Sequence, residues 1–300
     1  MDGLYFFLFL ALASIYFGGV FEGVVPLAGD AGLQNYPLRA FYSAEIKALR
    51  FPIWNPYEFA GLPYAGAMQT GAFYPLNILL YGTLHPAYAF NASLILHFAM
   101  SGFFTFLYLR LMGLGRAPSV FGGTAFAFSG FLAGYHPHTA IVNAGVWLPL
   151  AVYFLELLKR APSLRRMALL SLPVGVQILA GNFQMCMYTY MTLAVYAAFS
   201  MFELKGRGRV GFAALGIGGI VLGMLMALPQ ILSSLELSAL SIRPVATRTL
   251  GYIFFGEFHL YLKTLPSLIF PYLYADGAYG AAFRGGRHPL WKAPIPCAGL

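Results

Sequence analysis

The stretch Gly29-Asp30-Ala31-Gly32-Leu33-Gln34-Asn35-Tyr36-Pro37 is strongly polar, in a chain that is otherwise mostly apolar. It follows a hydrophobic run over residues 4–20, and the next such run begins only near residue 87. The segment between them also contains Phe51-Pro52-Ile53-Trp54-Asn55-Pro56 and ends with Tyr74-Pro75-Leu76-Asn77. Because Pro, Gly and Asn favour fixed turns, we expect a long structured loop over residues 21–77. Asp30 lies about ten residues beyond the first run.

The overall composition indicates a membrane protein. Apolar residues make up 59% of the 300 residues and charged residues only 9%, whereas a soluble domain carries roughly a quarter charged residues. The net charge of +8 does not indicate nucleic-acid binding, because the basic residues lie in short clusters between hydrophobic runs. Such clusters are typical of signals that orient a chain in a membrane.

Hydrophobic runs of roughly 20 residues predict membrane-spanning helices. We expect seven spans, at residues 4–20, 87–109, 119–135, 140–158, 167–180, 185–202 and 210–228. The chain is thus predicted to be an all-α polytopic protein with a transmembrane bundle over residues 1–235. Residues 236–300 are predicted to be an extracytoplasmic or interfacial segment, with an interfacial or re-entrant stretch at 252–274, and the start of a longer C-terminal half.

The basic residues of the short loops predict the orientation of the chain. Clusters at 110–116, 159–166 and 205–209 alternate with short loops, at 136–138 and 181–184, that contain no Lys or Arg. Under the positive-inside rule the basic loops are cytoplasmic. We therefore expect a multi-pass plasma-membrane protein with a cytoplasmic N-terminus and with Asp30 on the extracytoplasmic side.

A helix is expected near the middle of the first loop, beginning at Pro37 and ending before Phe51-Pro52. One of its faces is apolar and consists of Leu38, Phe41, Tyr42, Ile46 and Leu49. The other face is a polar, largely basic stripe of Arg39, Ser43, Lys47 and Arg50. A helix of this kind tends to lie flat in the headgroup layer, so we expect the stripe to face solvent and anionic phosphates.

Several motifs, in this order and spacing, resemble the bacterial YfhO family of membrane proteins. They are Asp30 with Gln34 and Pro37, Pro52-Ile53-Trp54-Asn55-Pro56, Gly61-Leu62-Pro63, Tyr74-Pro75-Leu76-Asn77, His136-Pro137, Asn143, Trp147-Leu148-Pro149, Gly181-Asn182 with Gln184, and Pro229-Gln230 with Glu236, Ser241 and Arg243. The similarity covers roughly residues 1–275. That family is similar to the GT-C glycosyltransferases, so the resemblance implies a GT-C-like helix bundle with an acidic residue in its first outer loop.

The resemblance also implies a function. GT-C enzymes move a sugar from a polyprenyl-phosphate carrier to an acceptor outside the cytoplasm, with inversion at the anomeric carbon. The expected partners are a polyprenyl-phosphate-linked sugar, a cell-envelope acceptor such as teichoic acid, and membrane lipids. Two alternatives stay open: a transporter or lipid flippase, and a non-catalytic partner in envelope assembly. Charges at span ends and the lack of an internal repeat count against transport.

Asp30 is the expected catalytic residue. A carboxylate suits the general base that removes the acceptor proton. The simpler interpretation is an N-cap or turn aspartate. No metal site is predicted from the residue spacing and no cofactor is assigned, although a divalent cation could sit at Asp30 together with water or phosphate oxygens.

The remaining candidate residues are assigned to substrate binding: Gln34, Arg39, Trp54, Asn55, His136, Asn182, Gln184, Glu236 and Arg243. Arginine stabilises an anionic leaving group, but Arg39 also suits a solvated helix face, and Arg243 also suits an ion pair with Glu236. Trp54 suits either stacking on a sugar or anchoring at the interface. Asn182 and Gln184 suit sugar hydroxyls or helix capping, and His136 suits acid–base chemistry or an ordinary interfacial role.

Overall fold

The structure is a computed structural model that describes residues 2–22, 24–27, 29–241 and 293–294. It is mostly helical, as expected for an all-α membrane protein. The predicted interfacial stretch at 252–274 and the candidate Arg243 lie outside the described residues.

The chain begins with α1 (Leu4–Tyr16), a 3-10 helix η1 (Gly18–Glu22) and a short strand β1 (Val24–Val25), which pairs antiparallel with β2 (Ala293–Pro294). The first loop holds a π-helix η2 (Ala31–Asn35), α2 (Tyr36–Lys47), a 3-10 helix η3 (Met68–Thr70) and α3 (Pro75–Thr83). The remaining elements are α4 (Pro86–Leu111), α5 (Arg116–Ala127), α6 (Gly130–Gly134), α7 (Thr139–Gly145), α8 (Trp147–Arg160), α9 (Leu164–Leu179), α10 (Phe183–Glu203), α11 (Gly206–Met226) and α12 (Leu228–Leu240).

All seven predicted spans coincide with helices, but those helices differ in length. Four helical stretches among the described residues are long and apolar enough to cross a membrane: α4, α7 with α8, α10, and α11. The helix of the first predicted span, α1, is apolar but only 13 residues long. Exposed apolar side chains such as Phe199 on α10 and Ile217 on α11 cover the outside of the bundle. Faces of this kind are suited to lipid, because acyl chains are as apolar as these side chains.

One predicted span is divided by a break that the hydrophobic pattern did not reveal, and another contains a single turn residue within an otherwise continuous helical stretch. The third becomes α5 and α6, because Ser129 starts a new helix and its hydroxyl accepts a hydrogen bond from the Leu132 amide. The fourth becomes α7 and α8, which meet at Val146. The interruption expected at Pro229 is present, since α12 begins beside it after Ala227.

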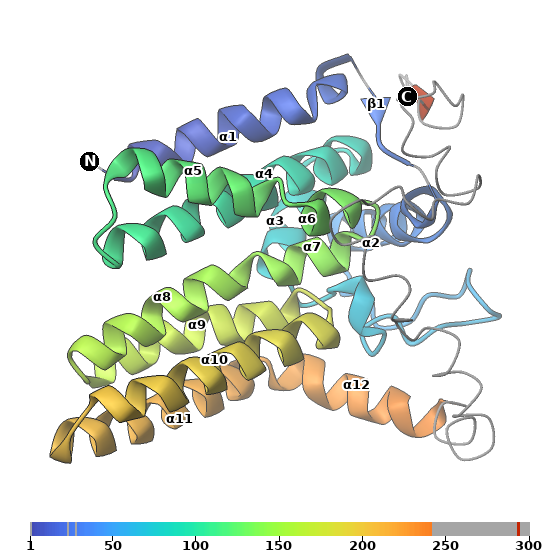
Figure 1. Cartoon of the computed structure of the whole chain (residues 1–300). Helices are drawn as coiled ribbons and strands as arrows, with labels where there is room; N and C mark the ends of the chain where they lie inside the picture. The colour runs from blue at the N-terminus through green and yellow to red at the C-terminus, as the bar shows by residue number, and fades with distance from the viewer. Residues whose placement is uncertain (1, 23, 28, 242–292, 295–300) are drawn as a thin grey trace, which may run out of the picture.

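The basic loops and the N-terminus gather at one end of the bundle, and the first loop lies at the other end. Figure 1 shows the α4–α5, α8–α9 and α10–α11 turns at the end that holds the N-terminus. Asp2 also lies 3.6 Å from Arg110 and 3.8 Å from Arg116. We call these the basic end and the loop end. The alternation of loops inferred from the sequence therefore matches the packing of the helices.

The solvated basic stripe expected on α2 is wrong in its first half. Arg39 and Ser43 are only 2% and 1% exposed, because α2 packs this face against α3 and the preceding loop. The Ser43 hydroxyl donates to the Tyr81 carbonyl at 2.7 Å, and the Tyr42 hydroxyl donates to the Ala72 carbonyl at 2.8 Å. Only Lys47 and the following Arg50 remain exposed.

A buried hydrogen-bonded chain connects the loop to two helices of the bundle. The His97 Nδ1 atom of α4 lies 2.6 Å from the Ser93 carbonyl, to which only an N–H can donate. Its Nε2 atom therefore accepts from the Tyr74 hydroxyl, 2.8 Å away. The same hydroxyl accepts from the Trp147 indole at 3.2 Å. Each polar group at this junction therefore has a partner.

We expect Tyr74→Phe to destabilise the protein by about 1–3 kcal/mol for each buried group that it leaves without a partner. The substitution removes the partner of both the His97 ring and the Trp147 indole. Thermal unfolding in detergent measures the effect. Tyr16→Phe is the control, because that side chain is half exposed. Equal unfolding temperatures for the two variants would contradict the assigned role of the Tyr74 hydroxyl.

Candidate functional site

Asp30 lies at the loop end and faces His138. One carboxylate oxygen is 3.5 Å from the His138 Nδ1 atom, and the two side chains are 53% and 41% exposed. Asp30 occupies the N-cap position of η2, as the simpler interpretation expects, but its side chain makes no capping hydrogen bond. The carboxylate is therefore accessible to a reacting group and has a histidine beside it.

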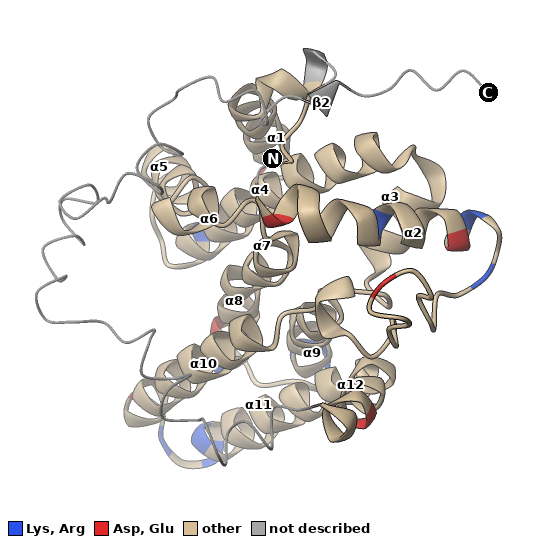
Figure 2. Cartoon of the chain, turned by 90° about the vertical axis from the view of Figure 1, so that its right-hand side faces the viewer, with Lys and Arg blue, Asp and Glu red and all other residues tan. Residues whose placement is uncertain are grey.

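Asn35 fixes the position of Asp30 against the loop that carries His138. Its side-chain amide donates 3.0 Å hydrogen bonds to the Asp30 and Pro137 carbonyls. Its amide oxygen accepts from the Thr139 hydroxyl at 3.4 Å. Figure 2 looks onto this end of the bundle, with α2 running across it and α7 close to the start of α2. The carboxylate and the imidazole thus come from segments about 100 residues apart, which one amide side chain connects.

A second feature of the loop end is a cavity of about 850 Å³ between the first loop and α12, which we call the loop cavity. Its polar lining residues are Gln34, Glu58, Gln69, Thr70, Ser234, Ser238 and Ser241. Hydrogen bonds hold its two walls together: Gln230 donates to the Ala65 carbonyl at 3.1 Å, and Ser234 donates to the Gly66 carbonyl at 3.0 Å. Neutral amides and hydroxyls with one carboxylate are suited to bind a polyhydroxylated ligand.

Arg39 lies behind one wall of the loop cavity. Its guanidinium donates to the carbonyl of Thr70, a lining residue, and lies 5.7 Å from the centre of the Tyr81 ring. No carboxylate lies within ion-pair distance of it in the described part of the chain, and its second terminal nitrogen has no hydrogen-bond partner there. Burial raises the pKa of Tyr81 to about 12, and it also raises the pKa of Tyr64. Both phenols are therefore neutral at physiological pH, and the positive charge of Arg39 has no local counter-ion among the described residues.

Trp54 and Asn55 belong to a hairpin beside this cavity. Asn55 and Leu62 exchange two 2.8 Å backbone hydrogen bonds, and the Asn55 side chain accepts from the Tyr57 amide at 3.0 Å. Trp54 is 53% exposed and packs over Gly61, where a Cβ atom would lie 2.1 Å from the indole. Asn55 thus shapes the turn, while Trp54 presents an accessible aromatic ring.

The other candidate residues are dispersed. Asn182 caps α10 by accepting from the Met185 amide at 3.0 Å, which is one of the two roles expected for it. Gln184 donates to the Tyr188 hydroxyl at 2.6 Å, and Glu236 is exposed on α12. The His136 Nδ1 atom lies 2.8 Å from the Ala133 carbonyl, and the ring packs on Phe17.

The structure thus brings two groups of residues to the loop end. Asp30 contacts His138 and Asn35, whereas Gln34 lines the loop cavity together with Glu58, Gln69 and the serines of α12. Of these partners, His138 is not among the residues assigned from the sequence, and no local pattern marks Asn35, Glu58 or Gln69. Within the described residues, no group of three or more His, Cys, Asp and Glu side chains could hold a metal ion. A cation at Asp30 would therefore need oxygen ligands from water or a bound phosphate.

Protonation of His136 is expected to destabilise the loop end. Burial lowers the pKa of this histidine below its ordinary value of 6.5, and the neighbouring His138 lowers it further. The unfolded chain therefore binds more protons than the folded chain just below that pH, so stability is lost as the pH falls. Unfolding temperatures in detergent should decrease between about pH 7 and about pH 5. The decrease should be smaller in His136→Gln; identical pH profiles for this variant and the unaltered chain would contradict this.

No known protein family, curated protein or solved structure matches this chain.

Proposed function

We propose that this protein is a membrane glycosyltransferase of the GT-C type. It moves a sugar from a polyprenyl-phosphate carrier to a cell-envelope acceptor on the extracytoplasmic side of the plasma membrane. In this proposal the basic end faces the cytoplasm, in accordance with the positive-inside rule. The loop end then lies at the outer surface, where both the lipid-linked donor and the acceptor are accessible.

The observation that carries the proposal is an accessible carboxylate on the same end of the bundle as a cavity of about 850 Å³, half of whose lining residues are polar. The cavity matches the hydroxyl-rich surface of a sugar. Leu38, Phe59 and Leu237 also line the cavity, and Phe59 is 85% exposed, so an apolar surface for a polyprenyl tail lies beside its polar groups. The unpaired charge of Arg39 favours the donor phosphate from behind the cavity wall.

The chemical step assigns a role to each part of the loop end. The acceptor hydroxyl loses its proton to Asp30 while its oxygen forms a bond to the anomeric carbon. The bond between that carbon and the phosphate oxygen breaks, and its electron pair leaves with the polyprenyl phosphate. His138 is a positioning residue that orients the carboxylate. A positive charge near the departing phosphate stabilises it, and Arg39 supplies one without touching it.

Proteoliposomes that contain the purified chain test this proposal. A panel of polyprenyl-phosphate sugars is supplied with envelope glycopolymer as acceptor, and free polyprenyl phosphate and glycosylated product are measured together. Equal amounts of both are expected for one sugar. Movement of the intact donor across the bilayer without free polyprenyl phosphate would instead show a flippase. A third outcome would show an assembly partner. The purified chain would then neither release polyprenyl phosphate nor move the donor, and the envelope glycans of cells would require the protein but not its Asp30 carboxylate.

A further inference from the structure

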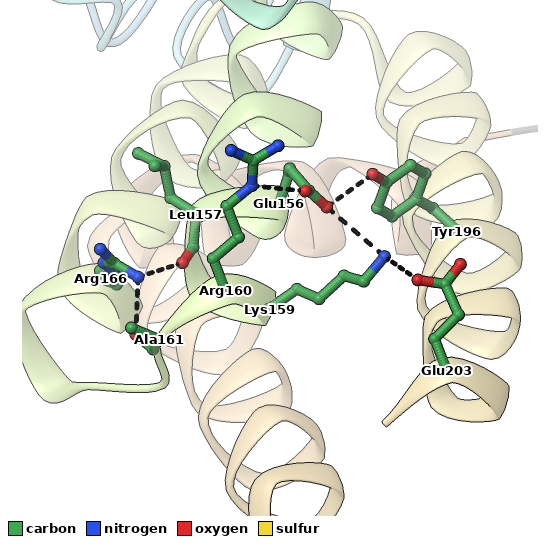
Figure 3. Close-up of polar contacts among 8 residues, drawn as sticks. All are labelled: Glu156, Leu157, Lys159, Arg160, Ala161, Arg166, Tyr196 and Glu203. Carbon is green, nitrogen blue, oxygen red and sulfur yellow. Dashed lines mark hydrogen bonds and ion pairs between the residues drawn. The ribbon is translucent and has the colours of Figure 1, made fainter. Parts of the chain in front are cut away.

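A network of charged residues connects α8 and α10 at the basic end. Glu156 is only 4% exposed. Its two oxygens accept hydrogen bonds from Arg160 at 2.7 Å and from the Tyr196 hydroxyl at 2.8 Å. Lys159 lies 2.7 Å from Glu203 and 3.8 Å from Glu156 (Figure 3). The charges within the network balance, because two carboxylates face two cations.

This network forms the polar end of a cavity of about 760 Å³ between α8 and α10, which we call the basic-end cavity. Glu156, Lys159, Tyr196 and Glu203 line it together with Thr192 and Ser200, and its other lining residues are apolar. The apolar residues Met191, Val195 and Phe199 belong to α10 and are 59%, 57% and 68% exposed. The cavity is therefore amphipathic and borders the face of the bundle that is suited to acyl chains.

The charge pattern of the basic-end cavity selects one class of occupant. Lys159 offers a cation to a phosphate, and Glu203 offers a carboxylate to an ammonium group. An anionic headgroup would pair with Lys159 but would also approach two carboxylates. A quaternary ammonium has no N–H to donate to Glu203. It would also need an aromatic ring to attract it, and the Lys159 ammonium already lies 5.9 Å from the centre of the Tyr196 ring.

We propose that the basic-end cavity binds a phospholipid with a primary ammonium headgroup, of the phosphatidylethanolamine class. The lipid phosphate pairs with Lys159, the ammonium pairs with Glu203, and an acyl chain runs along α10. The lipid replaces the single ion pair between Lys159 and Glu203 with two. The Glu203 side chain is 66% exposed, whereas that of Lys159 is 17% exposed, so the pair opens by movement of Glu203 toward solvent. Glu156 stays bound to Arg160 and Tyr196 and holds the cavity in shape.

Native mass spectrometry of the purified chain tests the proposal with three lipids that share the same acyl chains. Dioleoylphosphatidylethanolamine should bind about tenfold more tightly than dioleoylphosphatidylglycerol, and dioleoylphosphatidylcholine should also bind weakly, because a charge-assisted hydrogen bond contributes about that factor. Soluble glycerophosphoethanolamine should compete only at much higher concentration, since it has no acyl chain to bury. Competition at equal concentration would overturn the lipid assignment.

Glu203→Gln makes the test specific. The exposed position tolerates the change, and the cavity gains a net positive charge. We expect the preference for phosphatidylethanolamine to disappear and phosphatidylglycerol to bind at least as well. The matched control is Asp2→Asn, which removes a carboxylate from the same end of the bundle but lies beside Arg110 and Arg116. Its lipid preference should equal that of the unaltered chain. An unchanged preference in Glu203→Gln, or no preference in the unaltered chain, would overturn the proposal.

Discussion

Asp30→Asn is expected to lower sugar transfer by about 10²–10⁴-fold, the contribution of a positioned general base. The amide keeps the size of the carboxylate but cannot accept the proton of the acceptor hydroxyl at neutral pH. The side chain is 53% exposed and makes no capping hydrogen bond, so the fold should be retained. The measurement is the rate of free polyprenyl phosphate release by equal amounts of folded protein.

Glu45→Gln is the matched control for this variant. Glu45 is another carboxylate of the first loop, and it pairs with Arg50 at 2.8 Å, away from the cavity lining and from Asp30. Its substitution should leave transfer unchanged. His138→Gln should lower transfer less than Asp30→Asn does, because His138 acts only through the carboxylate. A normal rate in Asp30→Asn with normal protein level would remove the catalytic assignment.

Gly181→Ala is expected to destabilise the chain by about 3 kcal/mol or more, from a left-handed backbone and a steric clash together. Gly181 connects α9 to α10 with a φ angle of +97°, in the left-handed region that side chains avoid. A Cβ atom there would lie 2.2 Å from the Met68 carbonyl oxygen. The obstacle is backbone, so no side chain can rotate away, and η3 must shift together with Thr70 at the wall of the loop cavity.

Thermal unfolding in detergent measures this effect, with Gly145→Ala as the control. A Cβ atom at Gly145 would meet its nearest neighbour, a Leu132 methyl group, at 3.7 Å, which is ordinary contact. That variant should be neutral or slightly more stable, because alanine suits a helix better than glycine does. Equal stability of the two variants would contradict the close packing of the 181–184 turn against η3.

Much of the candidate site could not be predicted from the sequence, for reasons that Arg39 and Asp30 illustrate. Helix periodicity correctly predicts that the polar residues of the stripe share one face of α2. It does not predict which face of the helix a neighbouring segment covers. Here α3 and the preceding loop cover the side with Arg39 and Ser43. Asp30 was singled out by its position after a span, whereas its partner His138 and the connecting amide of Asn35 depend on how two distant loops pack.

The sequence by itself determined the all-α class, the location of the hydrophobic helices and the common end of the basic loops. These properties depend on local composition, because an apolar run of sufficient length must form a helix wherever water is excluded. The tertiary structure alone decided the burial of Arg39, the loop cavity against α12 and the amphipathic cavity between α8 and α10. Each of these features requires contact between residues far apart in the chain. Such contacts depend on the packing of the whole fold and not on local sequence.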